Sequence, residues 1–386
     1  MMATTLTGLR IWNGEGLCDA DAIRIEGPQI TAVGDAGDLA ADAKVINYSG
    51  ATAIPGLIDA HVHMVLDPEK RNPPDRDDVP DIVAMRRRAR DMIQAGITTA
   101  RDLGGGHWLE LALRDDIAKE SIEGPRLLCA GQPVTSSGGH CHFWGGEANS
   151  IDAINAVIDR QLEHQVDLIK VMATGGRMTS GSQPLEPQFS IPQLNQIVAR
   201  AEQAGLGVAA HCHGTAGINA AATAGVTTIE HCSWVGKDGW ASDYREDVAE
   251  LIAEGHIAIS PTVNAGWKRM LGNATGERIS RALRDMIARD IGIIASTDAG
   301  IPGVFHHDLP RALDVFQQLT ATSNAFTLAT ATSRSADVLG LGEVTGRIAT
   351  GLSADLLIVD GNPLTDLKDL CRPVGVWVRG QPLGSL

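Results

Sequence analysis

Residues 54–64 read IPGLIDAHVHM, an apolar run that ends in two histidines two positions apart. In the next stretch, DIVAMRRRARDMIQAG at residues 81–96, apolar residues recur at the spacing of one helix face, and ITTARDLG at residues 97–104 is again a short β-branched run. A strand, a helix and a second strand in this order are typical of a βα unit in a parallel sheet. The segment therefore predicts an α/β fold.

The same alternation continues to residue 300. Eight candidate strands, each followed by a Gly-rich or polar loop, occur at residues 54–64, 97–104, 125–131, 168–174, 207–214, 227–234, 258–264 and 293–300. Eight βα units predict a closed (β/α)8 TIM barrel, which commonly needs about 250 residues. In that fold, chemistry gathers at the carboxyl ends of the strands.

Both ends of the chain have a different texture. Short β segments separated by turn residues fill the chain before residue 54, and this style returns in GRIATGLSADLLIVDGNPL at residues 346–364. We predict that residues 1–53 and 345–386 together form a small β-sandwich domain. Residues 54–344 would then form the catalytic barrel.

Composition limits the class of partner. The 386-residue chain has 32 Lys and Arg against 47 Asp and Glu, a net charge of 32 − 47 = −15, which argues against binding to nucleic acid. Its six cysteines form no CxxC pair, and its N-terminus has no basic segment followed by an apolar one. We therefore expect a cytoplasmic protein that binds a small-molecule substrate, does not bind membranes and forms a homo-oligomer.

Polar residues able to bind a metal end the predicted strands. They are His61 and His63 in the first strand, Lys170 in the fourth, His211 and His213 in the fifth, His231 in the sixth and Asp298 in the eighth. Residues i and i+2 of a strand face the same side, so both histidines of the first strand project inward. A single buried histidine is more often a core residue than a ligand, but a same-face pair joined by two further histidines and an aspartate indicates a divalent-metal site.

Lys170 needs a separate explanation, because a protonated lysine beside two cations would be repelled. Burial and neighbouring positive charge can lower the pKa of its ammonium, and the neutral amine can then react with carbon dioxide to give a carbamate, an anion able to bridge two metals. The alternative is a lysine that reaches solvent or a substrate carboxylate.

The motifs resemble those of the amidohydrolase superfamily, over nearly the whole chain. The motifs that carry the resemblance are PGLIDAHVHM, IKVMATGG, AAHCHG, TIEHCS, STDAG and GRIATGLSADLLIVDGNPL, in that order along the chain. Within the superfamily, the sequence looks like the metal-dependent group with Xaa-Pro dipeptidase (prolidase)-like and imidazolonepropionase-like enzymes. The resemblance implies one metal on His61, His63 and Asp298, a second on His211 and His231, and a bridging carboxylated Lys170. Zinc is the expected metal, with manganese or cobalt as alternatives.

The implied mechanism is hydrolysis. Two cations that share a water lower its pKa and hold hydroxide at neutral pH, which attacks an amide carbonyl. Asp298 would take the proton from the hydroxide and pass it to the leaving amine, and His213 or His140 would donate a hydrogen bond to the developing oxyanion.

Substrate recognition is predicted in a loop of twelve residues, TSSGGHCHFWGG at residues 135–146. It resembles the GGH loop with which related enzymes reach a substrate carboxylate, so His140 and His142 are candidate binding residues, with Trp144 and His213. The residues from Cys141 to Trp144 depart from the family pattern, and His213 stands where several relatives have an aromatic hydroxyl. Arg177 is either a carboxylate clamp or an exposed loop arginine.

Five tryptophans lie in or near the loops that follow the strands: Trp108, Trp144, Trp234, Trp240 and Trp267. They either pack the loops onto helices or line the pocket, and in the second case the substrate carries an apolar or aromatic group. The Pro- and charge-rich segment at residues 67–81 is a candidate lid.

We therefore expect a binuclear metal-dependent amidohydrolase that cleaves an amide bond, by a metal-bridging hydroxide, in a dipeptide or N-acyl amino acid with a free carboxylate. A lactonase, a cyclic-amide hydrolase or a phosphotriesterase-like esterase on the same metal centre is the alternative. A deaminase is disfavoured, because deaminases of the superfamily generally use one metal with a catalytic glutamate and lack the lysine of the fourth strand. A scaffold without activity is also disfavoured, because all six ligand positions are intact.

Overall fold

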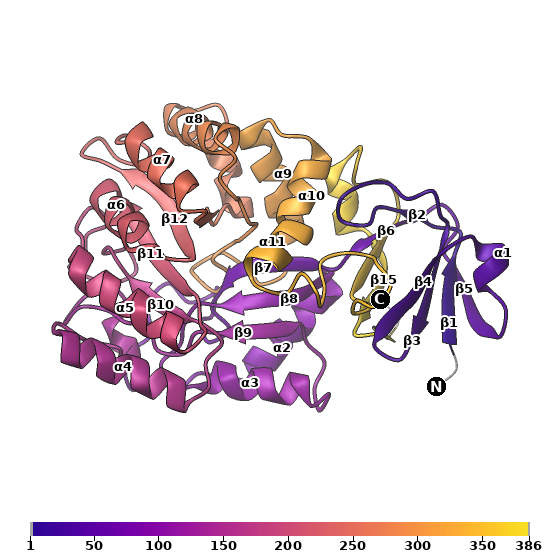
Figure 1. The fold of residues 1–386 in the computed structure, drawn as a ribbon, viewed down its shortest axis with the longest axis horizontal. Helices are drawn as coiled ribbons and strands as arrows, with labels where there is room; N and C mark the ends of the chain where they lie inside the picture. The colour runs from indigo at the N-terminus through magenta and orange to yellow at the C-terminus, as the bar shows by residue number, and fades with distance from the viewer. Residues whose placement is uncertain (1–2, 385–386) are drawn as a thin grey trace.

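The computed structural model describes residues 3–384, and its central part is built from parallel strands (Figure 1). These strands form two sheets, one in the order β7-β8-β9 and the other in the order β10-β11-β12-β13. Their bounds are β7 (Leu57–Val62), β8 (Ile97–Asp102), β9 (Arg126–Cys129), β10 (Ile169–Met172), β11 (Val208–Gly214), β12 (Thr228–Val235) and β13 (Ala258–Ser260). The predicted α/β class is confirmed, with parallel pairing between neighbouring strands.

The closed barrel is not observed. Among residues 3–384 the parallel strands form two sheets. Single backbone bridges connect them: Val134, after β9, pairs with Val171 on β10, and the segment at residues 293–299 pairs with Ile259 on β13 and with Val62 on β7. The segment at residues 293–300, predicted as the eighth strand, forms no strand in the structure. Asp298 has a φ of 63°, and this left-handed backbone is incompatible with a continuous extended ladder.

Helices lie on the outside of the parallel strands (Figure 1). They are α2 (Ile82–Gln94), α3 (Leu109–Ala118), α4 (Ile151–Glu163), α5 (Ile191–Gln203), α6 (Thr215–Ala224), α7 (Glu246–Glu254), α8 (Ala274–Ala288), α9 (Leu309–Thr320), α10 (Asn324–Thr330) and α11 (Ser333–Val338). In α2, Asp81 caps the first turn by accepting hydrogen bonds from the amides of Val83 and Ala84, and the buried face includes Met85, Ala89 and Met92. Short 3-10 helices occur at η1 (His142–Trp144), η2 (Ala265–Met270) and η3 (Leu367–Cys371).

No helix in the part of the chain that the structure describes is long and apolar enough to cross a bilayer.

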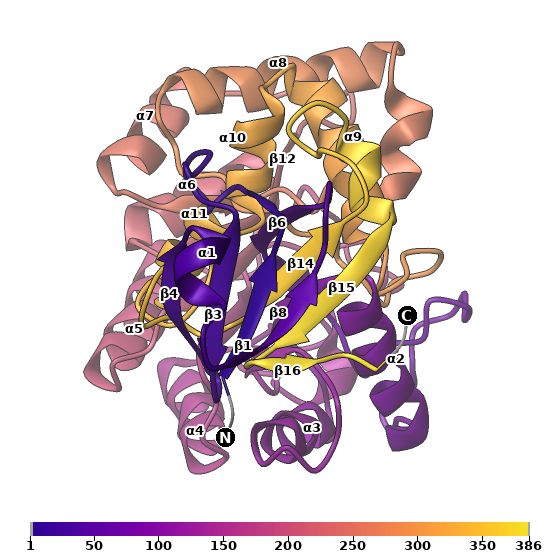
Figure 2. The same ribbon diagram turned by 90° about the vertical axis from the view of Figure 1, so that its right-hand side faces the viewer.

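Two further sheets are built from the ends of the chain (Figure 2): one contains N-terminal strands alone, and the other combines strands from both ends. Their orders are β4-β3-β1-β5 and β16-β15-β14-β6-β2. The bounds are β1 (Ala3–Thr7), β2 (Arg10–Ile11), β3 (Ala22–Glu26), β4 (Gln29–Gly34), β5 (Ala43–Asn47), β6 (Thr52–Pro55), β14 (Leu356–Val359), β15 (Pro373–Val378) and β16 (Gln381–Pro382), with the short helix α1 (Ala36–Leu39) after β4. The antiparallel pair of β14 with β6 brings the two ends together.

Strand β14 separates two hydrophobic cores. Leu356 and Ile358 pack in a core made with the N-terminal strands, whereas Leu357 and Val359 belong to the large core of the parallel sheets and their helices. All four side chains are fully buried. Since successive residues of a strand point to opposite faces, one short strand supports both cores.

We expect Leu357→Ala to lower the free energy of unfolding by about 2–5 kcal/mol, because it leaves a cavity where a fully buried side chain packs. Urea denaturation measures the change. The control is Val374→Ala on β15, whose side chain is 45% exposed, with an expected change below about 0.5 kcal/mol. Equal effects of the two substitutions would contradict the two-core arrangement.

Candidate metal centre

A cavity of about 590 Å³ opens at the carboxyl ends of the parallel strands. All six residues predicted as metal ligands line it: His61, His63, Lys170, His211, His231 and Asp298. The residues come from β7 and the residue after it, from β10, β11 and β12, and from the segment after Ile293, so the fold gathers in one place side chains that lie far apart along the chain.

His61 and His63 meet Asp298 across a backbone pairing. The amide of Asp298 donates to the carbonyl of His61 at 2.9 Å, and the amide of His63 donates to the carbonyl of Ala299 at 2.8 Å. The Nε2 atoms of His61 and His63 lie 3.3 and 3.4 Å from the same carboxylate oxygen of Asp298. Both imidazoles therefore lie beside one carboxylate oxygen of Asp298, and the assignment of a metal to these three residues stays a prediction.

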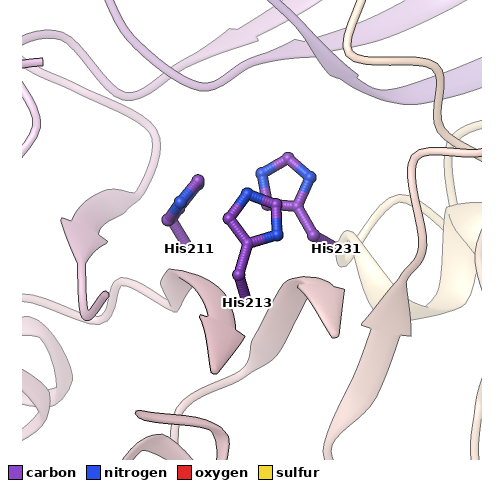
Figure 3. A group of neighbouring side chains, drawn as sticks. All are labelled: His211, His213 and His231. Carbon is purple, nitrogen blue, oxygen red and sulfur yellow. The ribbon is translucent and has the colours of Figure 1, made fainter. Parts of the chain in front are cut away.

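The rings of His211, His213 and His231 point toward one another from β11 and β12 (Figure 3). Each pair of ring centroids is 4.5 Å apart, and one nitrogen of each ring lies within 4.8 Å of the others. His231 also forms such a group with His61 and Asp298. The structure thus places His213, predicted as a catalytic and substrate-binding residue, within the same reach as the predicted ligands His211 and His231.

Several residues at the site have a left-handed backbone conformation, which sets the direction of their side chains. His231 has a φ of 64°, Thr262 of 53° and Asp298 of 63°. Such angles are uncommon for residues with a side chain, and they are outliers for a β-branched residue such as Thr262. Glu230 and His231 would face opposite sides of a regular strand, yet both contact the site, because the backbone at His231 departs from the extended form.

In His61, His63 and His211, one ring nitrogen donates a hydrogen bond to an oxygen acceptor, which leaves the other nitrogen free to bind a metal. Nδ1 of His61 donates to Oε2 of Glu230 at 2.9 Å, and Nδ1 of His63 donates to the carbonyl of Gly104 at 3.0 Å. On His211 it is Nε2 that donates, to the carbonyl of Gly175 at 3.2 Å. Carbonyls and ionised carboxylates only accept, so Nε2 of His61 and His63 and Nδ1 of His211 keep their lone pairs.

The electrostatics favour metal binding. Burial, and next the charge of Lys170, lower the pKa of His61 to about 4, and burial lowers the pKa of His211 and of His231 well below the usual value. The imidazoles are therefore neutral at pH 7, which is the form that binds a metal. Burial opposes ionisation of Asp298, but its interactions with His61 and with the nearby ring nitrogen of His63 outweigh burial and hold the pKa of its carboxyl below the ordinary value.

Lys170 is 1% exposed, and burial lowers the pKa of its ammonium. Among residues 3–384 its Nζ has no carboxylate within 4.0 Å, although Glu230 and Asp298 partly oppose the shift by their charges. A buried lysine without an ion-pair partner favours the neutral amine. Neutral imidazoles, an ionised carboxylate and such an amine form a nitrogen and oxygen donor set that fits divalent zinc, manganese or cobalt.

Two residues that sequence reasoning missed support the ligands. Arg101 on β8 donates from Nη2 to Oε1 of Glu230 at 2.8 Å and from Nε to the carbonyl of Ala60 at 2.7 Å. Glu230 accepts a hydrogen bond from His61 with its other oxygen. Burial raises the pKa of the Glu230 carboxyl, but Arg101 and His61 outweigh burial and lower this pKa below the ordinary value. A signal was present, because charged residues inside predicted strands are buried only when they are paired.

The candidate substrate residues divide into two groups. His140, His213 and Arg177 line the cavity, and the ring of His140 lies 4.6 Å from that of His211. His142 does not line it: its Nδ1 donates to the carbonyl of Gly139 at 3.0 Å. Trp144 packs 5.2 Å from the ring of His63 and lines a neighbouring cavity of about 630 Å³ under residues 67–81.

The remaining tryptophans also divide. Trp240 and Trp267 line the cavity of the metal centre. Trp108 stacks on His164 with ring centroids 3.8 Å apart, and Trp234 is 1% exposed in the core. Both interpretations of the tryptophans are therefore partly correct.

Glu110 on α3 is a buried carboxyl near this site, and neither of its oxygens has a hydrogen-bond partner among the described residues. Burial, and next the charge of Asp102, raise the pKa of Glu110. Asp102 itself accepts from the amides of Met64 at 2.6 Å and Gly104 at 2.9 Å. The carboxyl pair therefore lies directly behind the backbone that holds His63.

Comparison with family models matches residues 52–383 to the amidohydrolase family. Ochratoxinase from Aspergillus niger is 26% identical over 377 residues, which cover 85% of this chain and 75% of that protein.

Solved structures are similar along the full chain. A Xaa-Pro dipeptidase with bound methionine in the active site has a TM-score of 0.86 at 24% identity, with 99% of each chain covered. The crystal structure of A. niger ochratoxinase has a TM-score of 0.82 at 23% identity and covers 99% of this chain and 95% of its own. Likenesses at these identities show a shared fold.

We expect Glu230→Gln to lower the free energy of unfolding by about 3–5 kcal/mol, because it leaves the buried guanidinium of Arg101 without an ionised partner. The double variant Arg101→Met/Glu230→Leu should recover most of this loss, since apolar residues need no ion pair. The control is Glu246→Gln, whose partner Arg289 lies on the surface, with an expected effect below about 1 kcal/mol. Urea denaturation compares the four proteins, and a Glu230→Gln variant as stable as the control would refute the expected role of the pair.

We expect Glu110→Gln to remove part of the pH dependence of stability. The folded protein keeps the proton of Glu110 above about pH 4.3, where the unfolded chain loses it, so the free energy of unfolding falls as the pH rises and levels off above the raised pKa. Thermal unfolding of both proteins from about pH 5 to about pH 9 tests this. The variant should gain stability over the wild type as the pH rises, whereas a constant difference would contradict the buried ionisation. Glu277→Gln, at an exposed position of α8, is the control.

Proposed function

Because this chain belongs to the amidohydrolase family and is a hydrolase of amide or peptide bonds, we propose that it is a binuclear metal-dependent enzyme. Its substrate in this proposal is a dipeptide or an N-acyl amino acid with a free carboxylate. The observation that carries the proposal is the convergence of His61, His63, His211, His231, Asp298 and the buried Lys170 on one cavity.

In the proposed centre, His61, His63 and Asp298 would hold one divalent cation, and His211 and His231 the other. Zinc fits this donor set best, and manganese or cobalt fit as well. Two such cations would lower the pKa of a shared water, so that hydroxide is present at neutral pH, and would polarise the amide carbonyl.

Lys170 would complete the centre as a carbamate. Its neutral amine would form a bond to the carbon of carbon dioxide and lose a proton, which would give a carbamate whose oxygens carry the negative charge and could bind cations. The support is physical: the side chain is 1% exposed, has no ion-pair partner within residues 3–384, and lies among groups that bind cations. A neutral lysine in that place would leave two cations with a single anionic ligand, Asp298.

Proton transfer is assigned to Asp298. Its carboxylate is ionised, lies beside His61 and His63, and is 15% exposed at the side chain, so it can accept a proton from the attacking water and deliver it to the leaving amine. His213 and His140 line the same cavity and can donate to the oxyanion that develops on the scissile carbonyl. Burial lowers the pKa of each to about 3, so each is a neutral donor.

The domain division is part of the proposal: a barrel-like catalytic unit at residues 54–344, and a β-sandwich from residues 1–53 and 345–386. Cytoplasmic location and assembly into a homo-oligomer stay predictions.

The experiment measures amine release by protein loaded with zinc or manganese, in bicarbonate buffer, from pooled dipeptides and N-acyl amino acids. Ochratoxin is tested as a separate substrate because the chain is similar to an ochratoxinase. Release that disappears with a chelator and returns with metal supports the proposal. Turnover of lactones or phosphotriesters without any amine release would overturn it.

We expect Lys170→Ala to lower kcat/KM by more than about a hundredfold and to lower the number of metals bound per chain. Short carboxylates such as acetate should restore part of the activity, because they supply the missing anion. Metal analysis and steady-state kinetics test both effects, with Lys44→Ala, on the outer strand β5, as the control. Full activity with two metals in Lys170→Ala would exclude the bridging carbamate.

A further inference from the structure

The charges that line the cavity of the metal centre are the reverse of those of the whole chain. The protein has 47 acidic and 32 basic residues, yet among the described residues Asp298 is the only acidic side chain in the cavity wall. Three arginines line it: Arg71, Arg177 and Arg269. A cleft lined by one sign of charge concentrates ligands of the opposite sign.

These three residues, the arginine rim, come from separate loops. Arg71 lies in the segment after β7, Arg177 follows β10, and Arg269 belongs to η2 after β13. Within residues 3–384, none of the three has a carboxylate within 4.0 Å. Exposed arginines without partners also occur on the outer helices, but here three of them converge on the mouth of a single cavity.

Two of the three guanidinium groups are oriented along the cavity wall. The guanidinium of Arg177 lies over the ring of Trp240, 5.1 Å from its centroid. An arginine stacked in this way keeps its in-plane N–H groups available for an oxyanion. Nη1 of Arg269 lies 3.3 Å from the position that a Cβ atom of Gly266 would occupy, so this group folds back over another residue of the wall.

The surface beside the rim is apolar. Trp240, Trp267, Met270 and Ile279 line the same cavity, and we call them the apolar wall. Trp240 connects the two features, because its ring contacts Arg177 on one side and meets His213 at 4.9 Å between ring centroids. A charged group and an apolar group of one ligand therefore find their partners within a few ångströms of each other and of the metal centre.

This proximity selects a class of substrate. In a C-terminal amino acid, the carboxylate and the side chain leave the same Cα atom, so one residue can place its carboxylate on Arg177 while its side chain contacts Trp240. We infer that the site cleaves the amide bond that acylates a C-terminal aromatic or large aliphatic amino acid, with the arginine rim binding its carboxylate and the apolar wall its side chain. The inference rests on the proposed hydrolysis and adds the recognition residues Arg71, Arg269 and Trp267.

The first test compares three substrates of the metal-loaded protein: N-acetylphenylalanine, its C-terminal amide and N-acetylglycine. The first should have a kcat/KM at least about tenfold above each of the others, because a carboxylate bound by arginine and a buried aromatic ring each contribute at least this factor. Equal kcat/KM for the acid and the amide would overturn the role of the rim, while leaving amide hydrolysis intact.

Variants then separate the residues. Arg177→Gln and Arg269→Gln should each raise KM for N-acetylphenylalanine by about tenfold with a smaller change in kcat, and should bring the acid-to-amide ratio toward one. Trp267→Ala should instead bring the ratio of N-acetylphenylalanine to N-acetylglycine toward one. The matched control is Arg284→Gln, an exposed arginine on the outer face of α8. Variants that change no ratio would overturn the assignment.

A binding measurement keeps the inference independent of catalysis. Chelator-treated protein is titrated calorimetrically with 3-phenylpropionate and with 3-phenylpropionamide. Because the chelator has removed the metals, they cannot bind the carboxylate of the probe. The acid should bind at least about tenfold more tightly, and the double variant Arg177→Gln/Arg269→Gln should abolish the difference. Selective binding without turnover of any amide would support the anion site and overturn the proposed function. Equal binding of the two probes would overturn the anion site.

Discussion

The carboxylate of Glu230 connects the two parallel sheets from inside. Glu230 belongs to β12, but its oxygens bind Arg101 on β8 and His61 on β7, which are strands of the other sheet. All three side chains are buried, so the charges cannot return to water without opening the interior. A fully paired network of this kind contributes orientation more than net stability, because desolvation of the ions offsets much of their attraction. The network fixes the ring of His61, whose Nε2 lies beside the carboxylate of Asp298.

Backbone conformation adds to this constraint. His231, Thr262 and Asp298 all have left-handed φ angles, and each such residue costs on the order of 1–3 kcal/mol. The surrounding bonds keep these angles: Thr262 accepts or donates a hydrogen bond with Nδ1 of His231, and its amide donates to Oγ of Ser296. The same angle at Asp298 that interrupts extended pairing in residues 293–300 brings its carboxylate to His61 and His63. The left-handed φ of Asp298 thus both interrupts strand pairing in residues 293–300 and places the carboxylate at the site.

The composition of the cavity gives a consistent electrostatic picture. Deep in the cavity, neutral imidazoles, Asp298 and Lys170 form a donor set suited to cations. The exposed residues Arg71, Arg177 and Arg269 favour an anion, and Trp240 of the apolar wall contacts both Arg177 and His213. A substrate of the inferred class would place its carboxylate at the arginines, its side chain on the apolar wall and its amide at the cation-binding residues. Net negative charge elsewhere on the protein does not oppose this, since screening limits the reach of exposed charges to about 10 Å.

Periodicity and residue type alone determined much of this protein: the alternation of strands and helices, the contribution of both chain ends to the outer sheets, and the residues that line one cavity, from His61 to Asp298. These are local properties, because side-chain direction in a strand follows from a period of two and the order of elements from the hydrophobic pattern. Tertiary structure alone decided that residues 293–300 form no strand, that Glu230 joins Arg101 to His61, that His142 turns away from the cavity, and that Trp240 and Trp267 enter it while Trp234 does not. The sign of a φ angle and the partner of a buried charge depend on contacts between residues far apart in the chain, and no local pattern records them.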